Sequence, residues 1–63
     1  MNKIKEIRQA KGLTVRELAE KSNIATSYIS ELENDSENKK NPTKLIMDRI
    51  AKALDTTVPE VFY

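Results

Sequence analysis

One stretch of the sequence, residues 14–34 (TVRELAEKSNIATSYISELEN), constrains the fold more than any other. Its apolar residues recur at three- and four-residue spacing in two short segments, which is the pattern of amphipathic helices. Only the three residues Ser22-Asn23-Ile24 separate the two segments. The pattern therefore predicts two short helices joined by a sharp turn. Their predicted buried positions are Leu18, Ala19, Ile29 and Leu32.

The start of the first of these helices has two independent local signals. Thr14 and Glu17 have the spacing of a capping box, in which a hydroxyl and a carboxylate bond the unpaired amides at a helix start. Leu13 and Leu18 have the spacing of a hydrophobic staple across the same boundary. Gly12 lies just before, where a residue in the left-handed conformation would end a preceding helix.

The turn and the second helix of the pair are specified less strongly. Asn23 is expected to adopt the left-handed conformation, which asparagine tolerates better than other non-glycine residues do. The second helix is predicted from about Ala25 or Thr26 to Glu33. Ala25 has no side chain that can cap a helix, whereas Thr26 would cap one that began a residue later.

Three further helical segments flank this pair. The first is predicted over residues 2–11, the next from an N-cap at Thr43 to about Leu54, and the last begins at Thr57 with another Thr-x-x-Glu capping pattern. A wholly polar loop over residues 34–41 precedes the fourth helix. The apolar positions expected to complete the core are Ile4, Ile7, Ile46, Met47, Ile50, Ala51, Leu54, Val58, Val61 and Phe62.

These segments predict an all-α fold, with one domain over residues 1–63 built as a compact bundle of about five helices. The 63 residues suffice for one domain and no more. One glycine and two prolines are too few for the many turns of a β-sandwich or barrel. No strand-like alternation, internal repeat or heptad array competes with this interpretation.

The composition excludes several classes of function. Without histidine or cysteine, the chain has no usual zinc ligand and no thiolate nucleophile, and it has no glycine-rich phosphate loop. A chain of this length also has little room for a catalytic cleft, so we expect neither an enzyme nor a metal or cofactor site. No apolar run approaches about 20 residues, and the first residues do not form a signal peptide. The expectation is a cytoplasmic protein without a membrane segment.

The charge is unevenly distributed although its net value is only +1. Residues 1–16 carry a net +4 and residues 38–44 a net +3, whereas residues 17–37 carry −5 and the remainder −1. The two basic stretches could form one face for a polyanion in the folded chain. A solvated surface of mixed charge explains the same pattern, and charge alone favours that simpler interpretation.

The paired helices and their flanking segments together resemble the Cro/cI-type helix-turn-helix regulators, also called the XRE family. IKEIRQAKGLT is similar to the family's first helix, RELAEKS to its positioning helix, ATSYISELEN to its recognition helix and PTKLIMDRIAKALDTTVPEVF to its closing helices. The resemblance implies a bundle of about five helices that binds double-stranded operator DNA, usually as a homodimer. The recognition helix would then enter the major groove.

The resemblance also implies roles for particular residues. Members of this family read bases mainly with the N-terminal half of the recognition helix, and they contact phosphate at the start of the second helix and just after the third. They often pair an arginine of the first helix with the glutamate that ends the recognition helix, here Arg8 and Glu33. The implied base contacts are Ala25, Thr26, Ser27, Ser30 and Glu31. The implied phosphate contacts are Thr14 and Asn34.

Several positions depart from the family pattern. Val15 stands where many members have a phosphate-binding glutamine, so that contact is expected to be lost. Asn23 replaces the usual glycine of the turn, and the loop before Pro42 is longer than usual. Lys44 and Leu45 exchange the usual apolar and polar positions, which predicts either a shifted helix register or a Leu45 that is exposed for a partner.

Other candidate contacts have more than one interpretation. Tyr28 would bond a phosphate through its hydroxyl or pack on the first helix, and Lys39 and Lys40 would touch phosphate or stay in solvent. Glu31 would accept a bond from a cytosine amino group, repel phosphate or pair with a lysine. The candidate dimer interface, which overlaps the expected core, comprises Val58, Val61, Phe62 and Tyr63.

The leading functional hypothesis is therefore sequence-specific DNA binding. The protein would be a repressor that binds a palindromic operator as a dimer through residues 25–33. This segment lacks Arg, Lys, Asn and Gln, which make the strong bidentate base contacts, so one subunit should discriminate poorly between sequences. The alternative is an antitoxin or another protein-binding module of the same fold, with a regulatory protein held around Leu45 and Ile46.

Overall fold

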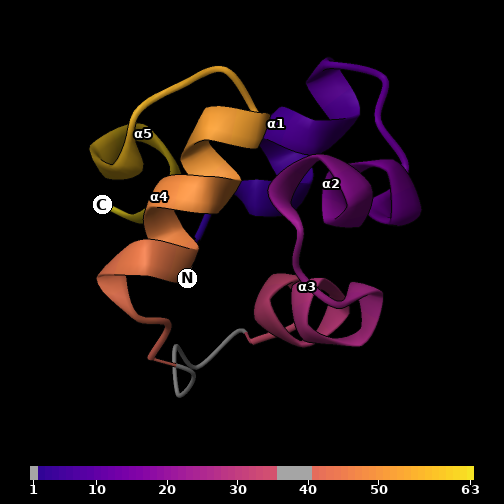
Figure 1. Cartoon of the computed structure of the whole chain (residues 1–63). Helices are drawn as coiled ribbons and strands as arrows, with labels where there is room; N and C mark the ends of the chain where they lie inside the picture. Colours follow the sequence, from indigo (N-terminus) through magenta and orange to yellow (C-terminus); the bar gives the residue numbers. More distant parts are fainter. Residues whose placement is uncertain (1, 36–40) are drawn as a thin grey trace.

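The computed structural model describes residues 2–35 and 41–63, and these ranges contain five helices and no strand. The all-α class and the five-helix bundle predicted from the sequence are confirmed. Within the described ranges, none of the helices is long and apolar enough to cross a membrane. The helices in Figure 1 are α1 (Ile4–Ala10), α2 (Val15–Ser22), α3 (Thr26–Glu33), α4 (Lys44–Ala53) and α5 (Val58–Phe62).

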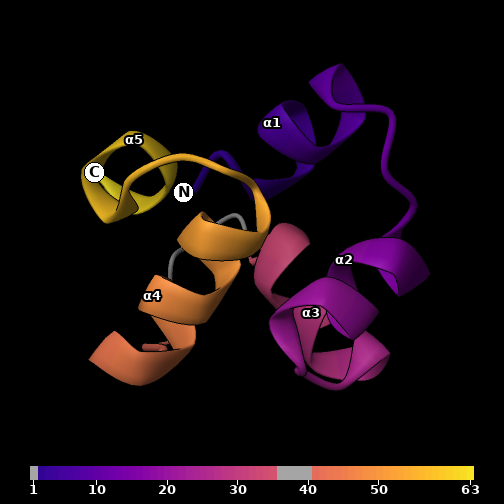
Figure 2. The same cartoon turned by 45° about the horizontal axis from the view of Figure 1, so that its top comes forward.

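Helix α2 lies between α3 and α4 in the packing of the bundle, because it contacts both of them. Helix α3 lies below α2 at the edge of the molecule and also packs on α1 (Figure 1). Helix α5 packs on α4 and α1, and the amide of Lys3 donates to the carbonyl of Val61 at 2.8 Å. The start of the described chain therefore lies beside α5, and α3 and α5 occupy different sides of the bundle (Figure 2).

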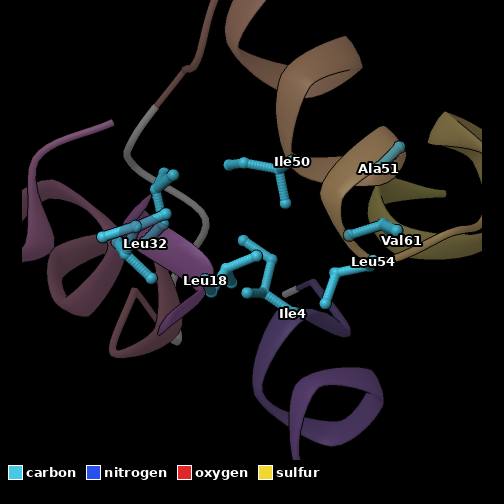
Figure 3. Close-up of a cluster of buried hydrophobic side chains, with 9 residues drawn as sticks. Ile4, Leu18, Leu32, Ile50, Ala51, Leu54 and Val61 are labelled. Carbon is cyan, nitrogen blue, oxygen red and sulfur yellow. The ribbon is translucent and has the colours of Figure 1, made fainter. Parts of the chain in front are cut away.

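The core forms where the apolar faces of all five helices meet. Ile4, Leu18 and Leu54 are fully buried and approach one another from α1, α2 and the end of α4 (Figure 3). Burying a side chain of this size contributes about 1.5–3 kcal/mol, which is large for a domain this small. The buried apolar residues are Ile4, Leu18, Ala19, Ile29, Leu32, Ile50, Ala51, Leu54 and Val61. All four core positions predicted for the paired helices are among them.

The predicted helix starts are confirmed at three threonines. At α2 the full capping box is present, since Thr14 Oγ1 accepts the amide of Glu17 at 3.0 Å and Glu17 Oε1 accepts the amide of Thr14 at 2.9 Å. Thr43 caps α4 and Thr57 caps α5 through their side-chain oxygens. Each cap satisfies an amide that the helix itself leaves unpaired.

Three helices end on a residue in the left-handed conformation, namely Gly12 (φ 72°), Asn23 (φ 58°) and Asp55 (φ 57°). After each of them the next amide reaches back to a carbonyl five residues earlier, which closes the last turn. These bonds are Leu13 N–H to the Arg8 carbonyl (3.0 Å), Ile24 N–H to the Ala19 carbonyl (3.1 Å) and Thr56 N–H to the Ala51 carbonyl (2.9 Å). The sequence predicts the left-handed conformation for Gly12 and Asn23 but not for Asp55.

Four details of the prediction need correction. Helix α1 begins at Ile4 rather than at residue 2, because the side chain of Asn2 accepts the Ile4 amide and so lies ahead of the helix. Ala25, not Thr26, is the N-cap of α3 and makes no side-chain bond there. Met47 is half-buried instead of forming part of the core. The capping box at α5 is half-formed, because the Glu60 carboxylate accepts the Thr56 hydroxyl at 2.6 Å.

Candidate nucleic-acid interface

The outer side of α3 carries small polar side chains. Ala25, Thr26, Ser27 and Glu31 are exposed, and Ser30 is half-buried. The structure thus brings together, on one helix and its N-cap, the five residues that the family resemblance implied as base contacts. A hydroxyl both donates and accepts hydrogen bonds, so this surface can bond base edges of either polarity as well as phosphate.

The inner side of α3 is anchored in the core. Ile29 and Leu32 are almost completely excluded from water, and the half-buried Tyr28 packs against the same cluster. The ring of Tyr28 therefore contributes to packing, while a phosphate bond through its hydroxyl remains a prediction. Because the buried face holds the helix, its exposed face has a defined orientation.

A nearly buried ion pair ties the end of α3 to α1. Arg8 Nε donates to Glu33 Oε2 at 2.7 Å and Arg8 Nη2 donates to Glu33 Oε1 at 3.1 Å, with side chains only 9% and 6% exposed. A third bond, from Arg8 Nη1 to the carbonyl of Leu13 at 2.7 Å, was not anticipated from the sequence. The hydrogen bond to Glu33 raises the pKa of Arg8 and outweighs desolvation, so the guanidinium stays charged.

The N-terminal end of α3 has no side-chain support of this kind. Ala25 occupies the N-cap without a side-chain hydrogen bond, and the first turn of α3 contains no acidic residue. The positive end of the helix dipole is therefore not offset by a side chain of that turn. This end of the helix suits the approach of an anionic phosphate.

The candidate phosphate contacts lie at the two ends of the helical pair. Thr14 is exposed at the start of α2, and a hydroxyl that accepts one bond can still donate another. Asn34 is exposed at the C-cap of α3. Val15 packs against the core and offers no polar group to a phosphate. Lys39 and Lys40 lie outside the described residues.

The four residues of the candidate dimer interface do not share one environment. Val61 is 1% exposed and fills the core of its own protomer, so it is not available to a partner. Val58 and Phe62 are half-buried against the core, whereas Tyr63 is 83% exposed. Any contact made through α5 would therefore rely on Tyr63 and the accessible parts of Phe62 and Val58.

Two polar side chains that support α3 and α2 were not predicted from the sequence. Asn2 Nδ2 donates to the carbonyl of Leu32 at 2.9 Å, and the buried hydroxyl of Ser22 donates to the carbonyl of Leu18 at 2.7 Å. The bond from the Asn2 side chain to the amide two residues on is a recognisable local turn. The bond from Asn2 to Leu32 spans 30 positions of sequence and has no local signal.

Comparison with known proteins gives consistent results for sequence and structure. The family described as Helix-turn-helix matches residues 4–61. The HTH-type transcriptional regulator SinR of Bacillus subtilis (strain 168) and that of Bacillus licheniformis are each 36% identical over 56 residues, which is 89% of this chain and 49% of theirs. The chain therefore spans about half the length of these relatives, which are named as transcriptional regulators rather than enzymes.

Two solved structures of SinR are also similar to the chain. The crystal structure of this master regulator for biofilm formation in complex with DNA has a TM-score of 0.82 and 35% identity, covering 90% of this chain and 87% of that one. The solution structure of the N-terminal DNA-binding domain of SinR from Bacillus subtilis has a TM-score of 0.78 and 34% identity, covering 92% and 81%. The family match, the sequence identity and the shared fold show that this chain belongs to the Cro/cI-type (XRE) helix-turn-helix family.

Proposed function

We propose that this chain is a DNA-binding transcriptional regulator that places α3 in the major groove of double-stranded DNA. The outer side of α3 carries the proposal, since it offers small hydroxyl side chains on a helix whose inner face and C-terminal end are fixed. An α-helix fits the major groove, and serine and threonine hydroxyls bond base edges there. The similarity to SinR, whose structure was solved in complex with DNA, supports this function.

In the proposed complex, the first turn of α3 reads the bases. Thr26, Ser27 and Ser30 bond base edges, and Ala25 packs close to the groove wall. Glu31 accepts a bond from a cytosine amino group and disfavours positions that would bring it against a phosphate. Thr14, Tyr28 and Asn34, together with Lys39 and Lys40, hold the DNA backbone on either side.

Weak discrimination by one subunit argues for two subunits on a palindromic operator. Half-sites read by such a dimer lie about 34 Å apart. The described part of one protomer measures 25 × 22 × 21 Å, and α3 lies on a different side from α5. Two protomers joined near Tyr63 would therefore leave the α3 helix of each protomer free to face the DNA. Bound in this way in the cytoplasm, the dimer would act as a repressor by covering its operator.

Selection of bound fragments from a random DNA pool tests the proposal. We expect enrichment of a motif with two inverted half-sites about one helical turn apart. A Thr26→Ala, Ser27→Ala double variant should lose the enrichment, whereas Gln9→Ala on the exposed side of α1 should retain it. If no motif is enriched even at low salt, sequence-specific DNA binding is not the function.

A protein-binding role is the second candidate, and the outer face of α4 favours it. Leu45 is 58% exposed, and Asp48, Arg49 and Lys52 follow it at helical spacing on the same face. A groove of about 330 Å³ between α2 and α4 adds Lys21 to these cations. The groove is lined by Lys21, Ser22, Arg49, Lys52 and Ala53, with no carboxylate. The face suits an acidic protein segment with one apolar side chain, as in an antitoxin or a regulator with an antagonist.

Co-expression with the product of a neighbouring gene tests this second role. A partner that uses this face should be lost with Leu45→Ser and with a Lys21→Ala, Arg49→Ala double variant. The matched control is Tyr63→Ser, which removes an exposed apolar side chain at the other candidate surface. Retention of the partner by both α4-face variants would place its binding site elsewhere.

A further inference from the structure

The side chain of Asn2 joins two helices that are far apart in sequence. Its Oδ1 accepts the amide of Ile4, the first residue of α1, at 3.1 Å, while Lys3 occupies the N-cap position. Its Nδ2 donates to the carbonyl of Leu32 at 2.9 Å, which caps the end of α3. One amide group therefore satisfies the unpaired Ile4 amide of α1 and adds a second bond to the Leu32 carbonyl, which also accepts the amide of Asp35 at 3.4 Å.

Core packing fixes the inner face of α3, and polar contacts at its C-terminal end add to that support. Its N-cap makes no side-chain bond and its last turn contains no basic residue. Its C-terminal end is held at two polar points, by Asn2 on the Leu32 carbonyl and by Arg8 of α1 on the Glu33 carboxylate. The next residue along, Lys3, bonds through its amide to the carbonyl of Val61 in α5. Residues 2 and 3 thus connect the end of α3 to α5.

We propose that Asn2 is a positioning residue that sets the orientation of α3 on the DNA; the proposal rests on the DNA-binding function proposed above. Helix α3 has eight residues and is therefore about 12 Å long. A rotation of about 5° about its C-terminal end would move its first turn by about 1 Å. A displacement of that size breaks a hydrogen bond, whose useful range of distance is only about 0.5 Å.

The chemistry of Asn2 allows its two bonds to be separated. Asn2→Ser keeps a neutral oxygen that can cap α1, but its shorter side chain has no amide to reach the Leu32 carbonyl. Asn2→Asp keeps the cap as well and places a carboxylate against the negative end of α3. Gln9→Glu makes the same amide-to-carboxylate change at an exposed site of α1 and controls for the added charge.

The test measures Kd for a selected operator duplex and for a duplex of unrelated sequence, together with Tm. We expect Asn2→Ser and Asn2→Asp to weaken operator binding by about tenfold, which corresponds to one or two lost base contacts. Binding to the unrelated duplex should stay within about twofold, because it depends on phosphate charge rather than on helix orientation. Gln9→Glu should change both affinities by the same small factor.

A role in stability alone predicts a different outcome. In that case Tm falls, but the folded variants bind the operator as tightly as the parent protein, and this result would overturn the proposal. An equal loss on both duplexes would overturn it too.

A parent protein that prefers no sequence would refute the proposed function without deciding the role of Asn2. Residual dipolar couplings of the backbone amides then measure the orientation of α3 relative to α2 in the parent and in Asn2→Ser. We expect the α3 couplings to change while those within α2 do not. Couplings of α3 that match the parent would show that Asn2 does not position the helix.

Discussion

A guanidinium and a carboxylate, both nearly excluded from water, fix the end of α3 at the scale of single residues. Arg8 donates two bonds to Glu33 and one to the carbonyl of Leu13, so every branch of its planar fork has a partner. Because the pKa of Arg8 is raised, its contribution to stability is present at all pH values below the ordinary pKa and is lost only in strong alkali. Arg8 therefore keeps the positive charge that the pair needs throughout the physiological pH range.

Replacing Glu33 by alanine should destabilise the fold strongly. The change leaves the buried Arg8 charge without its carboxylate, which costs about 3 kcal/mol or more and lowers Tm by more than about 10 °C. Thermal unfolding followed by circular dichroism measures the shift. The double variant Arg8→Met, Glu33→Leu should recover much of the loss, since it strands no charge. A fall in Tm of less than about 1 °C for Glu33→Ala would contradict the role given to the pair.

The backbone of Asp55 has an unfavourable conformation. It adopts the left-handed conformation (φ 57°), which is unfavourable by roughly 1–2 kcal/mol for most residues with a Cβ. Asp55→Gly should therefore stabilise the protein by about 0.5–1 kcal/mol after the greater freedom of the unfolded chain is deducted. Urea unfolding measures the change. Arg49→Gly, at an exposed position inside α4, is the control and should destabilise the protein by about 1 kcal/mol.

At the scale of elements, local capping decides where α2 begins. The Glu17 carboxylate accepts the backbone amide of Thr14, and this bond lowers its pKa, with a further contribution from the Thr14 side chain. A lowered pKa contributes stability that is present above the ordinary value and is lost as the pH falls through the folded value. The capping box is therefore a source of sensitivity to acid.

The pH dependence of Glu17→Gln tests this link. A neutral amide cannot titrate, so the variant should be less stable than the parent near neutral pH, and the difference should shrink as the pH falls through the acidic range below the ordinary glutamate pKa. Urea unfolding across that range provides the measurement. The exposed Glu6→Gln change serves as a control, because Glu6 lies in the first turn of α1 outside the capping box. A difference between Glu17→Gln and parent that did not vary with pH would refute the link.

These elements also show what the sequence could and could not predict. The start of α2 and its end at Asn23 were predictable because each rests on residues within five positions of one another. The start of α1 was misplaced because the turn that the Asn2 side chain makes with the Ile4 amide was not recognised as lying ahead of the helix. The bond from Asn2 to Leu32 could not be found from local pattern, since only the packing of α1 on α3 brings the two residues together.

At the scale of the whole molecule, exposed surfaces were the hardest part to predict. Core positions are constrained by helical periodicity, whereas an exposed serine or threonine on α3 satisfies the same pattern whether or not it contacts a base. The residues of the candidate dimer interface differ in burial, because Val61 belongs to the core and Tyr63 is exposed. The family match supports DNA binding as a class, and the individual contacts remain proposals.

Tyr63→Ala should weaken dimerisation without unfolding the protein. The side chain is 83% exposed in the protomer, so its removal should leave Tm within about 2 °C of the parent. Sedimentation of the protein on duplexes with one and with two half-sites should show loss of cooperative loading on the longer duplex. Asp48→Ala, at an exposed site of α4, is the control. Unchanged cooperativity for Tyr63→Ala would exclude this residue from the subunit contact.

The exposed start of α3 has a consequence for how such a protein can change over generations. Thr26 and Ser27 face solvent. Helix α3 is held instead by hydrogen bonds from Asn2 and Arg8 and by the packing of its own buried side chains. Substitutions at these two positions therefore alter the reading surface while the frame that presents it stays intact. A lineage can move from one operator to another through such changes, because each intermediate still folds and still presents a helix to the groove.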